Sequence, residues 1–202
     1  MSLRALALSL LVIPAALTAQ RDTVLLARDI DGTGKPDRIA IEHKKGKEYP
    51  TQRLMRTALY LDQKLKWSST WSDEVDGGLI DTVMTIPGGG SLVQLGYEFG
   101  DAGITTLLFA RNGRLRLLVE HAIGYDDGDY KLRSSATEIT VDASLAHLKA
   151  NGKDVISSIR CRAGTIPMAQ LVLDQKREML TLRRQYCATP KPQGAGVHGD
   201  GL

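Results

Sequence analysis

The most distinctive chemistry in the chain lies in a short acidic loop, residues 29–37, which has carboxylates at its first, third and ninth positions, Asp29, Asp31 and Asp37. Calcium takes six to eight oxygen ligands at about 2.3–2.6 Å and tolerates irregular geometry. Glycines at positions 32 and 34 permit the tight curvature that a loop needs in order to fold around an ion. The loop therefore predicts a calcium site.

The predicted ligands are the side chains of Asp29, Asp31, Thr33 and Asp37 and the backbone carbonyl of Lys35. The alternative is a turn without a metal, because Asp and Gly are common turn residues. In that case three carboxylates crowded into one turn would repel one another. The ion is expected to be structural, since no catalytic motif adjoins the loop.

An EF-hand is excluded as the framework of this loop. It requires a bidentate Glu at the twelfth position and two flanking helices, whereas the twelfth position here is Ala40 and the flanking runs, 23–27 and 38–42, have the composition of strands. The strand–loop–strand pattern Asp-x-Asp-Gly-x-Gly-x-x-Asp resembles the FG-GAP/VCBS repeats, the calcium loops of integrin-α-like propeller blades. The resemblance covers residues 24–41 only.

The resemblance implies that positions one, three, five and nine of the loop ligate through side chains and position seven through its carbonyl, which gives the same five residues. Position five is usually Asp or Asn in that family, so Thr33 predicts a weaker site. A propeller needs several blades, and the loop occurs once in this chain. The resemblance therefore implies one calcium hairpin and not a full propeller. Single-copy loops of this kind also occur in small exported all-β proteins similar to bacterial lysozyme inhibitors.

Other polar groups are weaker candidates. Asp126, Asp127 and Asp129 are flanked by tyrosines and predict a solvated turn, with a second cation site or a partner-binding loop as alternatives. Glu98 and Asp101 are a possible carboxylate pair for glycoside chemistry, although nothing fixes their separation. No catalytic residue is predicted.

The histidines and tryptophans favour structural roles. None of the four histidines, His43, His121, His147 and His198, has a metal-ligand spacing, so each is expected on the surface or in the core. Trp67 and Trp71 are expected on one face of a strand, in the core or, alternatively, as a carbohydrate platform.

Residues 1–19 have the layout of a signal peptide. Arg4 precedes an apolar run, 5–16, and a small-residue stretch, 15–19, suits signal peptidase. A membrane anchor is the alternative, but the run is shorter than the roughly 20 residues of a spanning helix and contains Pro14. We expect a secreted or periplasmic protein with no membrane anchor after cleavage.

The charge argues against one class of partner, and the cysteines predict a cross-link. The net charge is +3 and the basic residues are scattered, which argues against nucleic acid. Cys161 and Cys187 are the only two cysteines, and in an oxidising compartment they predict a disulfide, with free thiols or a metal pair as alternatives.

Turn signals separate short apolar or alternating runs every 8–12 residues, which favours an antiparallel β-sandwich or barrel-like domain over residues 20–187. The runs cover residues 23–27, 38–42, 57–62, 65–71, 79–86, 91–99, 105–110, 115–120, 138–142, 155–161, 170–174 and 178–183. Asn112-Gly113 predicts a hairpin turn, and residues 144–150 a single helical turn. Residues 188–202 are rich in Pro and Gly and are expected to be disordered.

These features together predict an exported, non-enzymatic calcium-binding β-domain that acts as a binding module. Its partner would be a protein or glycan at the cell exterior. The alternative is an inhibitor or immunity protein against a cell-wall hydrolase such as lysozyme. A weak hydrolase that uses an acidic loop is the third hypothesis.

Overall fold

The computed structural model describes residues 22–46, 53–72, 82–99, 102–123, 130–135 and 137–190, with the backbone alone for 97–99, 102 and 123. The expected signal peptide, Asp101, the acidic run at 126–129 and residues 191–202 of the expected tail lie outside the described residues.

The described residues form fourteen strands and no helix, so none of them builds a helix that is long and apolar enough to cross a membrane. The prediction of an all-β domain is confirmed. The strands are β1 Thr23–Arg28, β2 Asp37–Lys45, β3 Arg53–Leu61, β4 Lys64–Ser68, β5 Thr82–Thr85, β6 Ser91–Phe99, β7 Ala102–Arg111, β8 Arg114–Ile123, β9 Tyr130–Ser134, β10 Ile139–Ser144, β11 Leu148–Ala150, β12 Lys153–Asp154, β13 Ile166–Asp174 and β14 Met179–Ala188.

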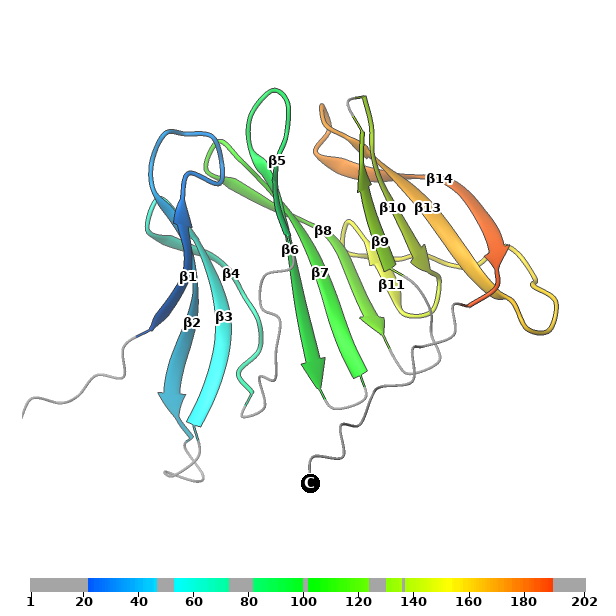
Figure 1. The fold of residues 1–202 in the computed structure, drawn as a ribbon, viewed down its shortest axis with the longest axis horizontal. Helices are drawn as coiled ribbons and strands as arrows, with labels where there is room; N and C mark the ends of the chain where they lie inside the picture. The colour runs from blue at the N-terminus through cyan, green and yellow to red at the C-terminus, as the bar shows by residue number, and fades with distance from the viewer. Residues whose placement is uncertain are drawn as a thin grey trace, which may run out of the picture.

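The strands build three open antiparallel sheets that lie side by side as layers (Figure 1). The first sheet has the order β1-β2-β3-β4, the central sheet β12-β11-β8-β7-β6-β5, and the third β14-β13-β10-β9. We call them the first, central and third sheets. Most neighbours in each sheet are consecutive strands, so hairpins form most of the pairings.

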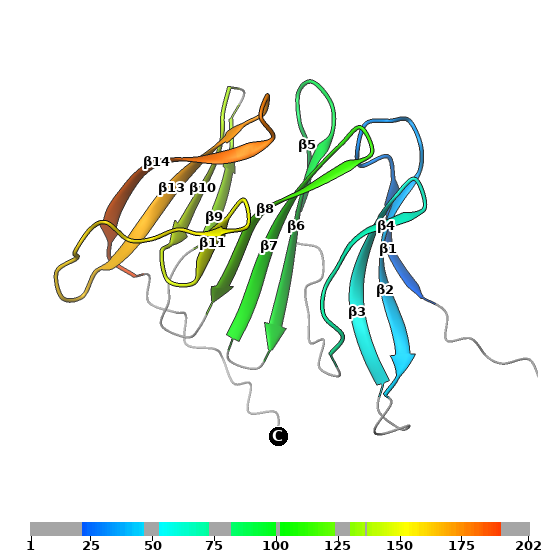
Figure 2. The ribbon, with the colours of Figure 1, turned by 180° about the vertical axis from the view of Figure 1, so that it is seen from behind.

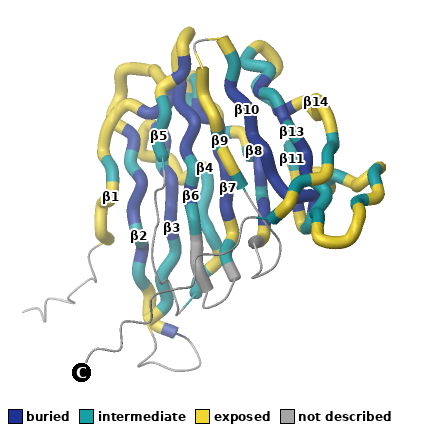
Figure 3. Tube along the Cα trace, turned by 45° about the vertical axis from the view of Figure 1, so that its right-hand side comes forward, coloured by how far each residue is buried: buried dark blue, intermediate teal, exposed yellow. Residues whose placement is uncertain are grey.

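The central sheet is buried on both faces, because alternate residues of each strand point to opposite sides. Val93 and Leu108 pack with Ile39 and Leu59 of the first sheet. Their sequence neighbours Leu92, Leu107 and Phe109 pack with residues of the third sheet that include Val141 and Leu171. The continuous apolar run Leu107-Leu108-Phe109-Ala110 is therefore the signature of a middle layer, and Figure 3 shows buried chain through the interior of the stack.

Two local predictions were wrong, and one strand was not predicted. Residues 144–150 form no helical turn, because Ser144 ends β10 and Leu148 begins β11. Residues 155–161 form no strand: the amide of Val155 donates to the carbonyl of Leu148 in β11, and the amide of Ser158 and the carbonyl of Ile156 bond to the side chain of Gln185. The strand β9 was not predicted; it is stabilised by five residue pairs with β10.

The two tryptophans do not share an environment. Trp67 packs against the core between the first and central sheets, as predicted. Trp71 lies beyond the end of β4, where the cationic groups of Lys44 and Arg56 are 4.1 and 4.6 Å from its ring centre. A carbohydrate platform built from both rings is therefore not formed.

The cysteine pair joins β14 to the segment that precedes β13. The Sγ atoms of Cys161 and Cys187 are 2.04 Å apart, as in a disulfide, so the structure pairs the two cysteines as predicted. Twenty-six positions separate the two residues.

Replacing both cysteines, as Cys161→Ser/Cys187→Ser, is expected to lower the free energy of unfolding by about 3 kcal/mol, because the open chain regains the entropy that a cross-link of this loop length removes. Thermal unfolding followed by circular dichroism measures the change. The wild type in reductant serves as the control and should have the same melting temperature as the double variant. Equal melting temperatures for the oxidised wild type and the variant would contradict the prediction.

Candidate metal centre

The acidic loop connects β1 and β2, which pair in antiparallel register from Thr23 opposite Ile41 to Arg28 opposite Asp37. This register brings the two ends of the loop together. Asp29, Asp31 and Asp37 each offer a carboxylate oxygen, and these three atoms lie within 4.8 Å of one another. Asp31 and Asp37 are 0% and 2% exposed, whereas Asp29 faces solvent.

Asp29 shapes the loop from its first position. Its Oδ1 accepts hydrogen bonds from the amides of Gly32 at 2.8 Å and Thr33 at 3.2 Å, and its Oδ2 accepts one from Gly34 at 2.8 Å. Gly32 and Gly34 both have φ near +78°, a conformation that costs little only for glycine. The two glycines therefore turn their amides toward the carboxylate.

Asp37 joins the loop to the turn between β3 and β4. Its Oδ2 accepts hydrogen bonds from the amides of Ile30 and Asp31, at 2.8 and 3.1 Å. Its Oδ1 accepts one from the amide of Asp62 at 2.9 Å. Asp62 and Gln63 form that turn, both with positive φ. The ninth loop position thus fixes a second hairpin.

Asp31 joins the loop to the central sheet. Its Oδ1 accepts hydrogen bonds from the amide and hydroxyl of Thr33, at 3.0 and 2.7 Å, and its Oδ2 accepts one from the amide of Gly113 at 2.6 Å. Its backbone carbonyl accepts another from the amide of Asn112. Asn112-Gly113 is the predicted turn, and it connects β7 to β8.

The surroundings of Asp31 favour its charged form. Burial raises the pKa of this carboxyl, but the hydrogen bonds from Thr33 and Gly113 lower it by more, so the pKa lies below its usual value. The hydroxyl of Thr33 donates a hydrogen bond to the carboxylate of Asp31. Thr33 at the fifth loop position therefore supplies a hydrogen-bond donor, whereas a fourth carboxylate there would be repelled by the other three.

A third hairpin turn meets the loop at Gly32. A Cβ atom on Gly32 would lie 3.0 Å from the amide nitrogen of Gly90, in the turn between β5 and β6. Figure 1 shows the turns of the first and central sheets gathered at one end of the molecule. Arg111 extends the contacts by donating to the carbonyls of Gly88 and Gln175. We call this meeting point the turn hub: residues 29–37, 62–63, 88–90 and 112–113.

The donor set fits a hard cation such as calcium. Each of the three carboxylates accepts three hydrogen bonds, and an ionised carboxylate has roughly four lone-pair sites. Each therefore retains one site for an ion. Three carboxylate oxygens, the hydroxyl of Thr33, the carbonyl of Lys35 and water would supply the six to eight oxygens that calcium takes.

The side chain of Lys35 points to another acid. Its Nζ lies 2.9 Å from Oδ2 of Asp62, and this hydrogen bond raises the pKa of the lysine. Only the backbone carbonyl of Lys35 belongs to the predicted ligand set, and that role stays a prediction.

The other acidic candidates from the sequence lie outside the described side chains. Glu98 lies in β6, with its side chain outside the described atoms, and Asp101 and the 126–129 run lie outside the described residues. Among the histidines, His121 is buried, His43 is half-buried and His147 is exposed. His198 lies outside the described residues.

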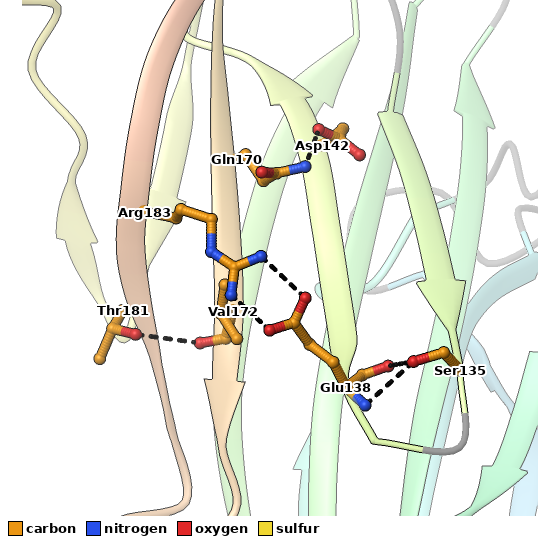
Figure 4. A network of polar contacts seen from close by, with 7 residues as sticks. All are labelled: Ser135, Glu138, Asp142, Gln170, Val172, Thr181 and Arg183. Carbon is orange, nitrogen blue, oxygen red and sulfur yellow. Dashed lines mark hydrogen bonds and ion pairs between the residues drawn. The ribbon is translucent and has the colours of Figure 1, made fainter.

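A polar network that the sequence did not reveal lies on the third sheet (Figure 4). Asp142 is buried and accepts hydrogen bonds from Gln170 at 3.2 Å and from the hydroxyl of Tyr186 at 2.9 Å. Burial first, and then Asp142, raises the pKa of Tyr186. Arg183 and Glu138 form a two-pronged ion pair nearby. These bonds join β10, β13 and β14 and indicate a structural role.

The contacts within the turn hub cannot be predicted from local sequence patterns, because they join residues far apart in the chain. Asp31 and Gly113 are 82 positions apart, and Asp37 and Asp62 are 25 apart.

No protein-family model, curated protein or solved structure matches the chain.

Proposed function

We propose that the protein is a non-enzymatic binding domain of the cell exterior, secreted or periplasmic, whose first hairpin is fastened by a structural calcium ion. The observation that carries the proposal is the convergence of Asp29, Asp31 and Asp37 within 4.8 Å. Thr33 and Lys35 complete the ligand set, as the resemblance to FG-GAP/VCBS loops implies. In this proposal the ion braces the domain and takes no part in chemistry.

The position of the acidic loop supports a bracing role. Asp31 and Asp37 connect it to two other hairpin turns, and Gly32 contacts a third. An ion bound to these carboxylates would stabilise the docking of the first sheet on the central sheet, because ligand binding to the folded state alone shifts the unfolding equilibrium.

The most enzyme-like pair in the described residues is poorly suited to catalysis. Nε2 of His121 lies 2.9 Å from Oγ of Ser144, which resembles a nucleophile beside a base. The two residues are 0% and 1% exposed, so a substrate could not reach the hydroxyl. The pair joins β8 to β10, which supports a structural role and a non-enzymatic function.

Calcium is expected to raise the melting temperature. For a Kd of about 10⁻⁴–10⁻³ M and a tenfold excess of calcium over Kd, binding should stabilise the fold by about 1.4 kcal/mol. This corresponds to a rise of about 3–5 °C for a domain of this size. Thermal unfolding in calcium and in chelator measures the difference.

Two matched variants sharpen this test. Asp29→Asn removes a charge from the cluster at an exposed position and should abolish the calcium shift. Asp174→Asn is the control, because the Oδ1 of Asp174 also accepts two backbone hydrogen bonds in a turn but lies outside the cluster. Identical melting in calcium and chelator for the wild type would refute the calcium brace.

A turbidity assay addresses the inhibitor hypothesis. A binding domain without inhibitory activity should leave the clearing of peptidoglycan by lysozyme unchanged. Dose-dependent protection of the peptidoglycan would instead assign the protein to the inhibitors of cell-wall hydrolases.

A further inference from the structure

The segment between β12 and β13, residues 155–165, is held in place without belonging to a sheet. At its start, Val155 packs against the core of the central and third sheets, and its amide donates to the carbonyl of Leu148. Further along, Cys161 is joined to Cys187 of β14. Figure 2 shows the segment running from β11 along β13 and β14 toward the outer end of the stack.

The side chain of Gln185 fixes the middle of this segment. Its Oε1 accepts hydrogen bonds from the amide and hydroxyl of Ser158, at 2.7 and 2.9 Å. Its Nε2 donates to the carbonyl of Ile156 at 2.8 Å. The side-chain amide of Gln185 thus bonds one backbone amide and one backbone carbonyl of the segment, as a neighbouring strand would. Residues presented by this segment therefore have defined positions.

An apolar side chain projects from this hydrogen-bonded segment. Ile156 is 82% exposed, more than any other large hydrophobic residue in the described part of the chain. Neither Gln185 nor the disulfide needs the Ile156 side chain, because both hold the segment through other groups. An exposed aliphatic side chain on a fixed backbone has apolar area available for a partner.

Exposed cations lie on both sides of Ile156 in the sequence, with one exposed acid, Asp154, between Lys153 and Ile156. Lys153, Arg160 and Arg162 are exposed, and none of them forms an ion pair with another described residue. Residues 130–190 contain ten Lys or Arg and five Asp or Glu, a net charge of +5, although the whole chain carries +3. The charge excess is therefore concentrated in the part of the chain that presents Ile156.

We propose that residues 153–162 form a docking site for an anionic phospholipid bilayer, with Ile156 inserted between the headgroups and Lys153, Arg160 and Arg162 against the lipid phosphates. Charge complementarity selects a polyanionic surface, and Ile156 selects one with an apolar layer beneath the charge. A polyanionic glycan would use the cations alone. An acidic protein would need a pocket shaped to the isoleucine, whereas a bilayer accepts a convex projection.

This inference supplies the proposed binding domain with a surface and a partner, and it is independent of the acidic loop. Association would be peripheral and reversible, because one aliphatic side chain and a few cations give weak binding. Half-saturation is expected at about millimolar accessible lipid.

Cosedimentation with vesicles tests the docking site. The full chain is mixed with vesicles of phosphatidylglycerol and phosphatidylcholine, or of phosphatidylcholine alone, in low salt and with chelator present. The chelator keeps the outcome separate from that of the calcium brace. Binding to the anionic vesicles alone is expected. Ile156→Ser should weaken it by about tenfold, and Arg160→Ser/Arg162→Ser by about 30-fold.

Two control variants match these changes. Leu182→Ser removes an exposed leucine from β14, and Lys176→Ser/Arg177→Ser removes two cations from the β13–β14 turn. Both should bind the anionic vesicles as the wild type does. All variants are checked for an unchanged melting temperature, so that misfolding cannot imitate a loss of docking.

Three results would overturn the proposal. The first is no binding to anionic vesicles. The second is an equal loss in the control variants, which would assign the binding to overall charge. The third is a loss in the arginine variant with none in Ile156→Ser, together with retention on an anionic polysaccharide, which would assign the surface to a glycan.

Discussion

Gly90→Ala is expected to lower the free energy of unfolding by about 5 kcal/mol, because it combines backbone strain with a steric clash. Gly90 has φ +87°, where a residue with a Cβ atom is strained by about 1–3 kcal/mol. The new Cβ would also lie 2.3 Å from the carbonyl oxygen of Ala110 and 3.0 Å from the Cβ of Arg111. Both neighbours belong to β7, so relief requires a shift of the central sheet or of the turn.

Gly89→Ala separates the two sources of strain. Gly89 has a similar φ of +97°, but no heavy atom lies within 4 Å of the position that its Cβ would take. This control should therefore lose only the backbone contribution, about 1 kcal/mol. The melting temperatures should differ by roughly 10 °C between the two variants. Equal melting temperatures would contradict the close approach of the β5–β6 turn to β7.

Asp31→Ala is expected to lower the free energy of unfolding by about 4 kcal/mol in chelator. The change removes a buried carboxylate and leaves the amide of Gly113 and the hydroxyl of Thr33 without their acceptor, while the amide of Thr33 keeps only its longer bond to Asp29. Hydrogen bonds to a charged group contribute about 1.5–3 kcal/mol each. The contact between the acidic loop and the central sheet would be weakened at the same time. Thermal or urea unfolding in chelator measures the loss.

Asp31→Asn tests whether shape or charge matters. The amide retains one oxygen acceptor, so in chelator it should lose less stability than the alanine variant. It should nevertheless lose the calcium shift, because the amide carries no charge. Asp154→Asn, an exposed acid outside the turn hub, is the control and should change neither quantity. Wild-type stability for Asp31→Ala would show that the turn hub is not a determinant of the fold.

Local patterns predicted much of the strand content. The runs before and after the acidic loop, the strand 91–99 and the Asn112-Gly113 turn follow directly from alternation, β-branched residues and turn chemistry. The strand β9 was not predicted because its alternation is short, with Tyr130 and Leu132 as the two apolar residues, and it is stabilised by pairing with β10. The 155–161 run looks like a strand locally, but Gln185 and the disulfide determine its conformation.

The three-layer arrangement could not be predicted in the same way. One stretch of the chain indicates this arrangement. Residues 105–110 are buried without interruption, whereas a strand with one face in solvent would alternate buried and exposed residues. That stretch indicates burial on both faces but does not identify the strands that cover them. The covering strands come from positions far apart in the chain, such as Leu59 and Leu171.

The acidic loop was predicted as a unit, and the structure adds its connections. The spacing of Asp29, Asp31 and Asp37 already indicated that the carboxylates converge. The contacts with Asp62, Gly90 and Gly113 depend on how hairpins pack, which local spacing does not encode. Because of these contacts, an ion held at the loop would brace the junction of two sheets as well as one hairpin.

Calcium titration followed by amide resonances tests the calcium brace most directly. Chelator-stripped, ¹⁵N-labelled protein is titrated to about 10 mM calcium, a tenfold excess over the weakest expected Kd. A single saturable transition is predicted, with the largest shifts at Gly32, Gly34 and Gly113, whose amides donate to the carboxylates of Asp29 and Asp31. Asp29→Asn should abolish it. No saturable shift at these three glycines, or small shifts spread over all exposed acids, would contradict the calcium brace.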